Sequence, residues 1–189
     1  MSQSESDFIP NQIASKPDST VRRTRLREFQ TQLSARMQTA RSGEDTRRNQ
    51  LGVLIGDRRW LLNLQSAGEI VSVGAITKVP LTQSWFLGLT NIRGSLISVI
   101  DFAHFLGLPQ TSIDKDSRIV AFASSLSFNS SLLVDRILGL RDVADMQLQT
   151  TAEAGTLQGA SYVDSDSHVW TELDLSHVVQ DSQFLHVSL

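Results

Sequence analysis

Residues 85–101 read Trp-Phe-Leu-Gly-Leu-Thr-Asn-Ile-Arg-Gly-Ser-Leu-Ile-Ser-Val-Ile-Asp, and this stretch decides the fold. Its apolar end has the composition of a buried strand, and it follows a corner that contains Gly88 and Gly94. Glycine permits positive φ and close approach of the backbone at such corners. Arg93 sits at this corner and is the only cation among residues 79–96. A guanidinium fixed by a rigid turn can contact a carboxylate in bidentate fashion. The residues alone leave open whether that carboxylate is internal or belongs to a partner.

Outside this stretch the chain is composed of short apolar runs separated by turn residues. Residues 51–55 and 60–64 flank Gly56-Asp57-Arg58, which predicts a hairpin. Several β-branched runs at this spacing favour barrels or a sandwich. Further strands are expected at 69–73, 96–100, 118–123, 131–140, 159–163 and 168–172, and short helices at 101–106 and 175–179.

Three of these segments together resemble the CheW family of chemotaxis adaptors. Gly88-Leu89-Thr90-Asn91-Ile92-Arg93-Gly94 is similar to the family's Gly-x-x-Asn-Leu-Arg-Gly hallmark, with Ile92 in place of leucine. Glu69-Ile70 stands where the family has a Glu-Ile before a proline-containing loop, and residues 133–139 are similar to its Leu-Val-Asp-x-Val-x-Gly strand. The resemblance covers roughly residues 50–180 and implies an adaptor without catalytic activity, cofactor or metal.

The resemblance also implies a fold and a set of partners. The expected fold is all-β, with two SH3-like five-stranded β-barrels that share a hydrophobic core, a few short helices and an N-terminal amphipathic helix. The expected partners are the cytoplasmic tip of a methyl-accepting chemoreceptor and a CheA-like histidine kinase. By matching position, the expected receptor-binding residues are Ala67, Glu69, Ile70, Asn91, Arg93, Ser131 and Leu132, and Gly88 and Gly94 are expected in a kinase- or receptor-binding surface.

Composition limits the remaining functions. The chain has 189 residues and no cysteine, which excludes a disulfide framework and thiolate metal sites and fits the cytoplasm. Residues 1–48 hold nine Lys/Arg and six Asp/Glu, a net +3, whereas residues 49–189 hold eight and fourteen, a net −6. An acidic body argues against nucleic acid as a partner. No apolar run is long enough to span a bilayer, so direct membrane insertion is not expected.

The N-terminal residues predict two segments. Residues 1–20 are polar, contain two prolines and predict a disordered leader. Residues 21–48 predict an Arg-rich amphipathic helix and linker, because apolar residues recur at spacings of three and four from Leu26 to Ala40. This helix can pack on the folded body, dock on a partner or lie on an anionic membrane surface. The CheW-like domain is expected at 49–181 and a tail at 182–189.

The sequence contains no pattern typical of a catalytic or metal-binding site, which favours a protein without catalytic activity or a bound metal. The sequence has no phosphate-binding glycine loop and no strained Gly-x-Ser-x-Gly elbow, and its four histidines are dispersed. Asp101 is expected to start a helix, His104 to lie at the surface, and Asp135 to serve a turn or an ion pair inside an apolar run.

Two segments narrow the resemblance further. Residues 25–36 and 184–187 look like the PilI adaptors of type IV pilus systems, which would make twitching motility the output. The alternatives are a flagellar-type chemotaxis coupling protein and a small-barrel nucleic-acid-binding protein.

Overall fold

The computed structural model describes residues 49–151 and 156–189, and the predicted leader and amphipathic helix lie outside these residues. The elements of the described part are β1 (Asn49–Ile55), β2 (Arg58–Asn63), β3 (Ala67–Ser72), β4 (Phe86–Ile92), β5 (Ser95–Asp101), α3 (Phe102–Phe105), β6 (Arg118–Phe122), the 3₁₀ turn η1 (Ser124–Leu126), β7 (Ser130–Val134), β8 (Arg136–Asp142), η2 (Val143–Asp145), β9 (Gln147–Thr150), β10 (Gln158–Val163), β11 (Val169–Leu173), α4 (Leu175–Val178) and α5 (Ser182–Leu185).

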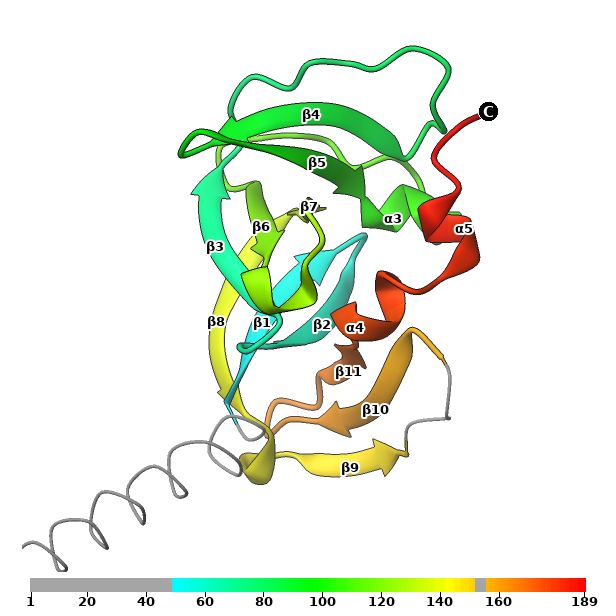
Figure 1. Ribbon diagram of the computed structural model, residues 1–189. Coiled ribbons are helices and arrows are strands. Elements are labelled where there is room, and N and C mark those ends of the chain that lie inside the picture. The colour runs from blue at the N-terminus through cyan, green and yellow to red at the C-terminus, as the bar shows by residue number, and fades with distance from the viewer. Residues whose placement is uncertain (1–48, 152–155) are drawn as a thin grey trace, which may run out of the picture. The chain divides into compact units, whose positions relative to one another are not determined.

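The strands form two sheets, as Figure 1 shows. One has five strands in the order β3-β6-β7-β5-β4, and the other has six in the order β8-β1-β2-β11-β10-β9. Both are mixed, because β5 pairs with β7 and β11 pairs with β2 in parallel. The predicted all-β architecture of two small units is confirmed, with six strands rather than five in the second unit.

Two-residue turns close the predicted β1–β2 hairpin and also the β4–β5 hairpin, where the sequence indicated only a corner. Gly56 and Asp57 have φ of 55° and 64°, and Arg93 and Gly94 have φ of 49° and 87°. Positive φ at both central residues suits the right-handed twist of paired strands. The first turn is held by Asp135, whose Oδ2 accepts a hydrogen bond from the Gly56 N–H at 2.8 Å. The expected turn role of Asp135 is confirmed.

The predicted single strand over 131–140 is wrong, because the chain changes sheets at Asp135. β7 lies between β5 and β6 in the five-stranded sheet, whereas β8 pairs with β1 in the six-stranded sheet. The Asp135 N–H donates to the Leu54 carbonyl at 2.9 Å, which fixes the crossing point on β1. This crossing connects the two sheets directly.

A shared apolar core joins the sheets, as predicted. It combines one face of β1 and β2 with inward residues of β5, β6 and β7, and with Phe102, Leu175 and Phe184. A second, smaller cluster lies within the five-stranded unit around Val99, Ile119 and Leu133. Each strand of that unit therefore alternates between its own interior and the shared core.

The C-terminal residues belong to the folded body, although the sequence suggested a separate tail from residue 182. Asp181 begins α5 by accepting hydrogen bonds from the N–H groups of Gln183 and Phe184, each at 2.9 Å. The Phe184 side chain is 2% exposed and packs against four aromatic rings of the shared core. Val187 then pairs with Gln83 through a 2.8 Å backbone hydrogen bond.

Candidate partner-binding site

A groove of about 310 Å³ opens between the two edge strands of the five-stranded sheet. β3 and β4 are the terminal strands of that sheet, and residues 75–77 close only part of the gap between them. Thr77 and Leu89 exchange backbone hydrogen bonds at 2.8 and 2.9 Å, and the Thr90 hydroxyl donates to the Ala75 carbonyl at 2.9 Å. The remaining gap is lined by Glu69, Val71, Ser72, Gly74, Thr90, Asn91, Ile92, Arg93 and Ile119.

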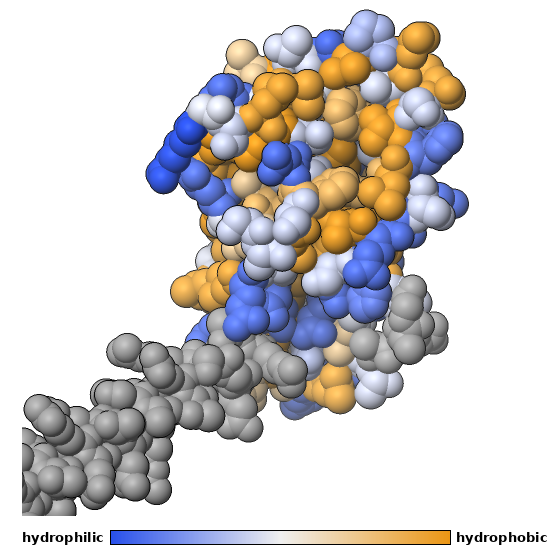
Figure 2. Space-filling model, viewed as in Figure 1, coloured by the Kyte–Doolittle hydropathy of each residue, from blue (hydrophilic) through white to orange (hydrophobic). Residues whose placement is uncertain are grey.

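Arg93 lies at the rim of this groove, at the tip of the β4–β5 hairpin. Its Nε donates to Glu69 Oε1 at 2.8 Å, while 82% of the Arg93 side chain remains exposed. The sequence left open whether Arg93 contacts an internal carboxylate or a partner. Arg93 does contact an internal carboxylate, and most of its guanidinium surface is still free to contact a partner. Figure 2 shows hydrophilic side chains gathered at this hairpin tip beside an apolar surface.

Asn91 fixes the backbone that presents the arginine. Its Oδ1 accepts a hydrogen bond from the Gly94 N–H at 2.8 Å, which closes the turn from inside the hairpin. The Asn91 side chain is exposed, and its amide nitrogen has no protein partner within the described residues. Asn91 therefore orients Arg93 and offers a donor of its own at the rim.

The structure brings together part of the predicted site and separates the rest. Glu69, Asn91 and Arg93 meet at the groove, and Gly94 is exposed at the hairpin tip. Ile70 is 42% exposed, but it alternates to the other face of β3 and does not line the groove.

Four predicted residues are buried, and the structure does not support direct contact of their side chains with a partner. Ser131 and Leu132 are fully buried in β7, and the Ser131 hydroxyl donates to the Ser98 carbonyl at 2.7 Å. Ala67 is 9% exposed and packs in the shared core. Gly88 has φ of 133°, and a Cβ there would lie 2.2 Å from the Thr77 carbonyl oxygen. Gly88 therefore permits close approach of the backbone at the closure of the sheet and lies beneath the surface.

The sequence missed groove residues inside the hallmark motif, including Thr90, and others that precede it. Val71, Ser72, Gly74 and Thr90 line the groove because β3 and the 75–77 segment face β4 across the sheet closure. Side chains of a strand alternate between its two faces, so the position of Glu69 could have indicated that Val71 lies on the same face. The strand that pairs with β3 could not be predicted from the sequence.

Asp101 and His104 serve structural roles. The fully buried Asp101 caps α3 by accepting from the His104 N–H at 3.1 Å, as predicted for a helix start. The His104 ring lies between the Ser84 hydroxyl at 2.8 Å and the Leu108 carbonyl at 3.1 Å, which satisfies both ring nitrogens.

The β10–β11 hairpin gathers the one group of possible metal ligands found among residues 49–151 and 156–189. Oxygen or nitrogen atoms of Asp164, Asp166 and His168 lie within 4.8 Å of one another. Desolvation opposes ionisation of Asp164, but hydrogen bonds from the Trp170 indole and from the His168 and Asp166 N–H groups outweigh it and lower the Asp164 pKa to about 2. These hydrogen bonds stabilise the turn between β10 and β11 and account for the closeness of the three side chains. We therefore assign no metal to this cluster.

The described helices are all too short and too polar to cross a membrane.

The two mixed sheets around a shared apolar core define the chain as an all-β protein of two small units. Comparisons with known proteins identify its family. The CheW-like domain matches residues 50–183, so the chain belongs to the CheW family. The crystal structure of the scaffolding protein TtCheW from Thermoanaerobacter tengcongensis superposes with a TM-score of 0.58 at 22% identity, covering 72% of this chain and 94% of TtCheW, which shows the same fold.

The chain is also similar to two motility proteins named PilI and FrzA. PilI of Pseudomonas aeruginosa is 26% identical over 91 residues, which span 48% of this chain and 51% of PilI. FrzA of Myxococcus xanthus is 25% identical over 134 residues, which span 68% of this chain and 83% of FrzA. The chain therefore spans about half the length of PilI and most of FrzA. The predicted resemblance to the CheW family, with similarity to PilI, is confirmed.

Proposed function

We propose that this protein couples a methyl-accepting chemoreceptor to a CheA-like histidine kinase in the cytoplasm, as a non-catalytic adaptor in arrays that the receptors anchor to the membrane. The observation that carries the proposal is the exposed Arg93 guanidinium, held at a rigid hairpin tip over an open groove in a chain of the CheW family. Its function is positional, because it holds receptor and kinase in one assembly so that receptor motion alters kinase activity.

The geometry of the groove suits exchange of one carboxylate for another. The Arg93–Glu69 pair is largely exposed, and exposed ion pairs contribute about 0 to 1 kcal/mol. A receptor carboxylate can replace Glu69 at little cost and form the bidentate contact that Nε alone does not make. The partly buried Val71 and the buried Thr90 then form a wall of the groove against which the receptor segment can pack.

The test is capture of a receptor tip by variants of Arg93. Arg93→Glu should weaken receptor binding by about 1.5 kcal/mol or more, which is roughly tenfold in Kd. Because this variant also places two carboxylates together, the swap Glu69→Arg/Arg93→Glu restores the internal pair. If Arg93 contacts the receptor, the swap remains defective.

Arg136→Glu is the matched control for this experiment. Arg136 is also an exposed arginine in a surface pair, with Asp116 at 3.4 Å, and it belongs to the six-stranded sheet. It should retain receptor binding. Full recovery by the charge swap, or equal losses in Arg93→Glu and Arg136→Glu, would overturn the role given to Arg93.

We further propose that the output is type IV pilus twitching motility, which the similarity to PilI supports. Deletion of the gene should abolish expansion of twitching zones and leave flagellar swimming unchanged. The reverse pattern would assign the protein to a flagellar-type chemotaxis system. Capture of the kinase and receptor from the same cells, followed by their identification, would name the partners.

A further inference from the structure

Two arginines of the six-stranded sheet converge on one tryptophan. Arg59 on β2 pairs with Trp170 on β11, and residues directly opposite each other share one face of a sheet. This face points away from the shared core. The Arg59 Cζ lies 5.9 Å from the centroid of the Trp170 ring, and the Cζ of Arg141, which comes from β8, lies 4.9 Å from it. The fold thus gathers two guanidiniums from distant strands at one indole.

The Trp170 ring is a fixed platform for these cations. Trp170 is 1% exposed, and its indole N–H donates to Asp164 Oδ2 at 2.8 Å. Gly52 makes room for the ring, because a Cβ at residue 52 would lie 2.8 Å from Trp170 Cζ3 and 3.2 Å from Arg141 Cγ. A guanidinium that stacks on an aromatic face still has N–H groups at its edge that can donate. The two arginines are therefore oriented before any ligand arrives.

Neither arginine forms an ion pair in the part of the chain that the structure describes. Arg141 Nη2 donates to the Leu138 carbonyl at 3.2 Å, but Arg141 Nε is buried and has no hydrogen-bond partner. Arg59 is partly buried and contacts only the Trp170 ring through its guanidinium. A partly buried charge without a counter-charge is costly, and an unpaired buried donor adds to that cost. Both costs fall when an anion binds.

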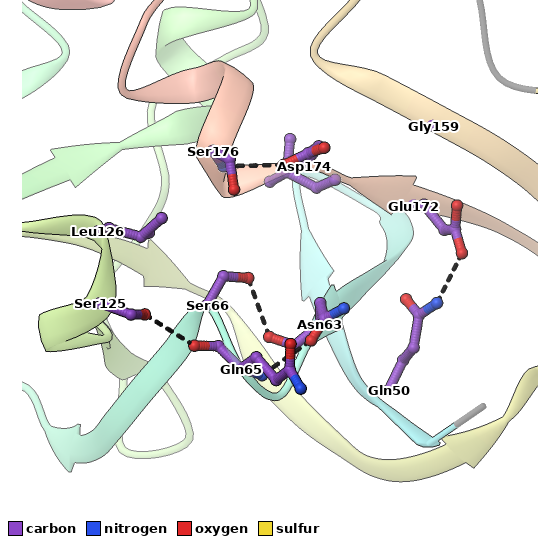
Figure 3. Close-up of a pocket in the computed structure, with 11 residues that line it drawn as sticks. Gln50, Asn63, Gln65, Ser66, Ser125, Leu126, Gly159, Glu172, Asp174 and Ser176 are labelled. Atoms are coloured by element: carbon purple, nitrogen blue, oxygen red, sulfur yellow. Dashed lines mark hydrogen bonds between the residues drawn. The ribbon is translucent and has the colours of Figure 1, made fainter. Parts of the chain in front are cut away.

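Two carboxylates border this site, and neutral donors already hold both of them. Glu172 accepts from the Gln50 amide at 2.6 Å, as Figure 3 shows, and from the Tyr162 hydroxyl at 3.3 Å. Asp164 accepts from the Trp170 indole and from two backbone N–H groups of its own turn. The internal acids therefore leave the two guanidiniums without a counter-ion.

We propose that Arg59 and Arg141 bind the carboxylates of an acidic segment on a protein partner. A guanidinium matches the two oxygens of a carboxylate and is more weakly hydrated than an ammonium, so it suits such a contact. Nucleic acid fits less well, because it requires several cations along one groove and residues 49–189 carry a net −6. The exposed Leu148, which pairs with the Trp170 neighbour Tyr162, offers an apolar contact beside the charges.

The test titrates isotope-labelled full-length protein with acetyl-Gly-Glu-Glu-Gly-amide at low ionic strength, followed by NMR. Saturable shifts should appear at the Trp170 indole N–H and at the backbone of residues 59 and 141, with a millimolar Kd. The matched peptide with two glutamines, which keeps the shape and lacks the charges, should not bind. Inorganic phosphate at the same ionic strength should bind more weakly than the glutamate peptide. Tighter binding of phosphate would overturn the assignment to an acidic protein segment.

Arg59→Gln and Arg58→Gln provide a matched pair of variants. Both remove one charge from β2, but adjacent residues of a strand point to opposite faces, and only Arg59 of the two contacts Trp170. Arg59→Gln should raise the Kd about tenfold, the effect of one lost charge-assisted contact, and Arg58→Gln should change it less than about twofold.

A third variant separates this site from the groove at Arg93, which lies in the five-stranded unit. Arg93→Gln should leave the response of the Trp170 indole N–H to the glutamate peptide unchanged. Absence of saturable shifts, equal binding of the glutamine peptide, or equal effects of Arg58→Gln and Arg59→Gln would overturn the proposal.

Discussion

Replacing the buried Asp101 with asparagine should destabilise the protein by about 3 kcal/mol, because its carboxylate accepts three hydrogen bonds. Oδ1 takes the His104 N–H at 3.1 Å and the Thr111 hydroxyl at 2.9 Å, and Oδ2 takes the Thr111 N–H at 2.8 Å. Asp101 ends β5, starts α3 and anchors residue 111, so these bonds join three segments of the chain.

The magnitude follows from what asparagine can keep. Its single oxygen can retain the helix cap and the Thr111 hydroxyl, but the NH₂ group then faces the Thr111 N–H, a donor against a donor. One charge-assisted bond, about 1.5 to 3 kcal/mol, is lost. The Thr111 N–H is only partly buried, so leaving it unpaired adds about 1 kcal/mol, and the total is about 3 kcal/mol. The opposite orientation of the amide loses two bonds instead of one.

Urea unfolding followed by tryptophan fluorescence measures this change. With a slope of about 2 kcal/mol/M, a loss of 3 kcal/mol lowers the midpoint by about 1.5 M. Asp116→Asn is the control, because Asp116 forms only an exposed pair with Arg136 and should change stability by less than about 0.5 kcal/mol. Equal midpoints for the two variants would refute the role given to the Asp101 carboxylate.

Three further predictions concern the remaining structural assignments. Gly88→Ala should lower the urea midpoint by at least about 1 M, because its Cβ would clash with the Thr77 carbonyl. Gly74→Ala should leave the midpoint unchanged, because no atom lies within 4 Å of a Cβ at that position. Similar midpoints for the two variants would contradict the close approach of residues 77 and 88. Because the pKa of Asp164 is lower in the folded state than its unfolded value of about 3.9, this carboxylate stabilises the fold above about pH 3.9, and the stabilisation is lost as the pH falls toward 2. Asp164→Asn should therefore make the free energy of unfolding less dependent on pH in this acidic range. An unchanged pH dependence would argue against the hydrogen bonds of Asp164. Phe184→Ala should lower the free energy of unfolding by about 3 to 5 kcal/mol. A loss below about 1 kcal/mol would show that α5 contributes little to the folded body.

The turn chemistry and the hallmark could be predicted because they depend on local geometry. Gly56-Asp57 sets the first hairpin with two positive φ values. Asp101 and Asp135 are polar residues at the ends of apolar runs, where a cap or a turn bond compensates their burial. The resemblance then supplied the arrangement of two units around one core.

The missed elements depend on pairing between distant strands. β4 was taken for a corner because its residues mix glycine and polar side chains, and it becomes a strand by pairing with β5 along its length. All four residues of β9 are exposed, so no apolar alternation marks this edge strand. Ser131 and Leu132 matched a binding region by position, but β7 is covered on both faces, which one strand's sequence does not reveal.

The position of Arg93 itself argues for a role in binding rather than in stability. A residue other than glycine or asparagine at φ of 49° is strained, at a cost of about 1 kcal/mol, and an Asn-Gly turn would fit this hairpin better. Its pair with Glu69 is exposed and returns about 0 to 1 kcal/mol. The two terms roughly cancel, so the folded state gains little from an arginine at this tip. The placement of a guanidinium at a strained, exposed corner beside an open groove therefore supports the proposed contact with a partner.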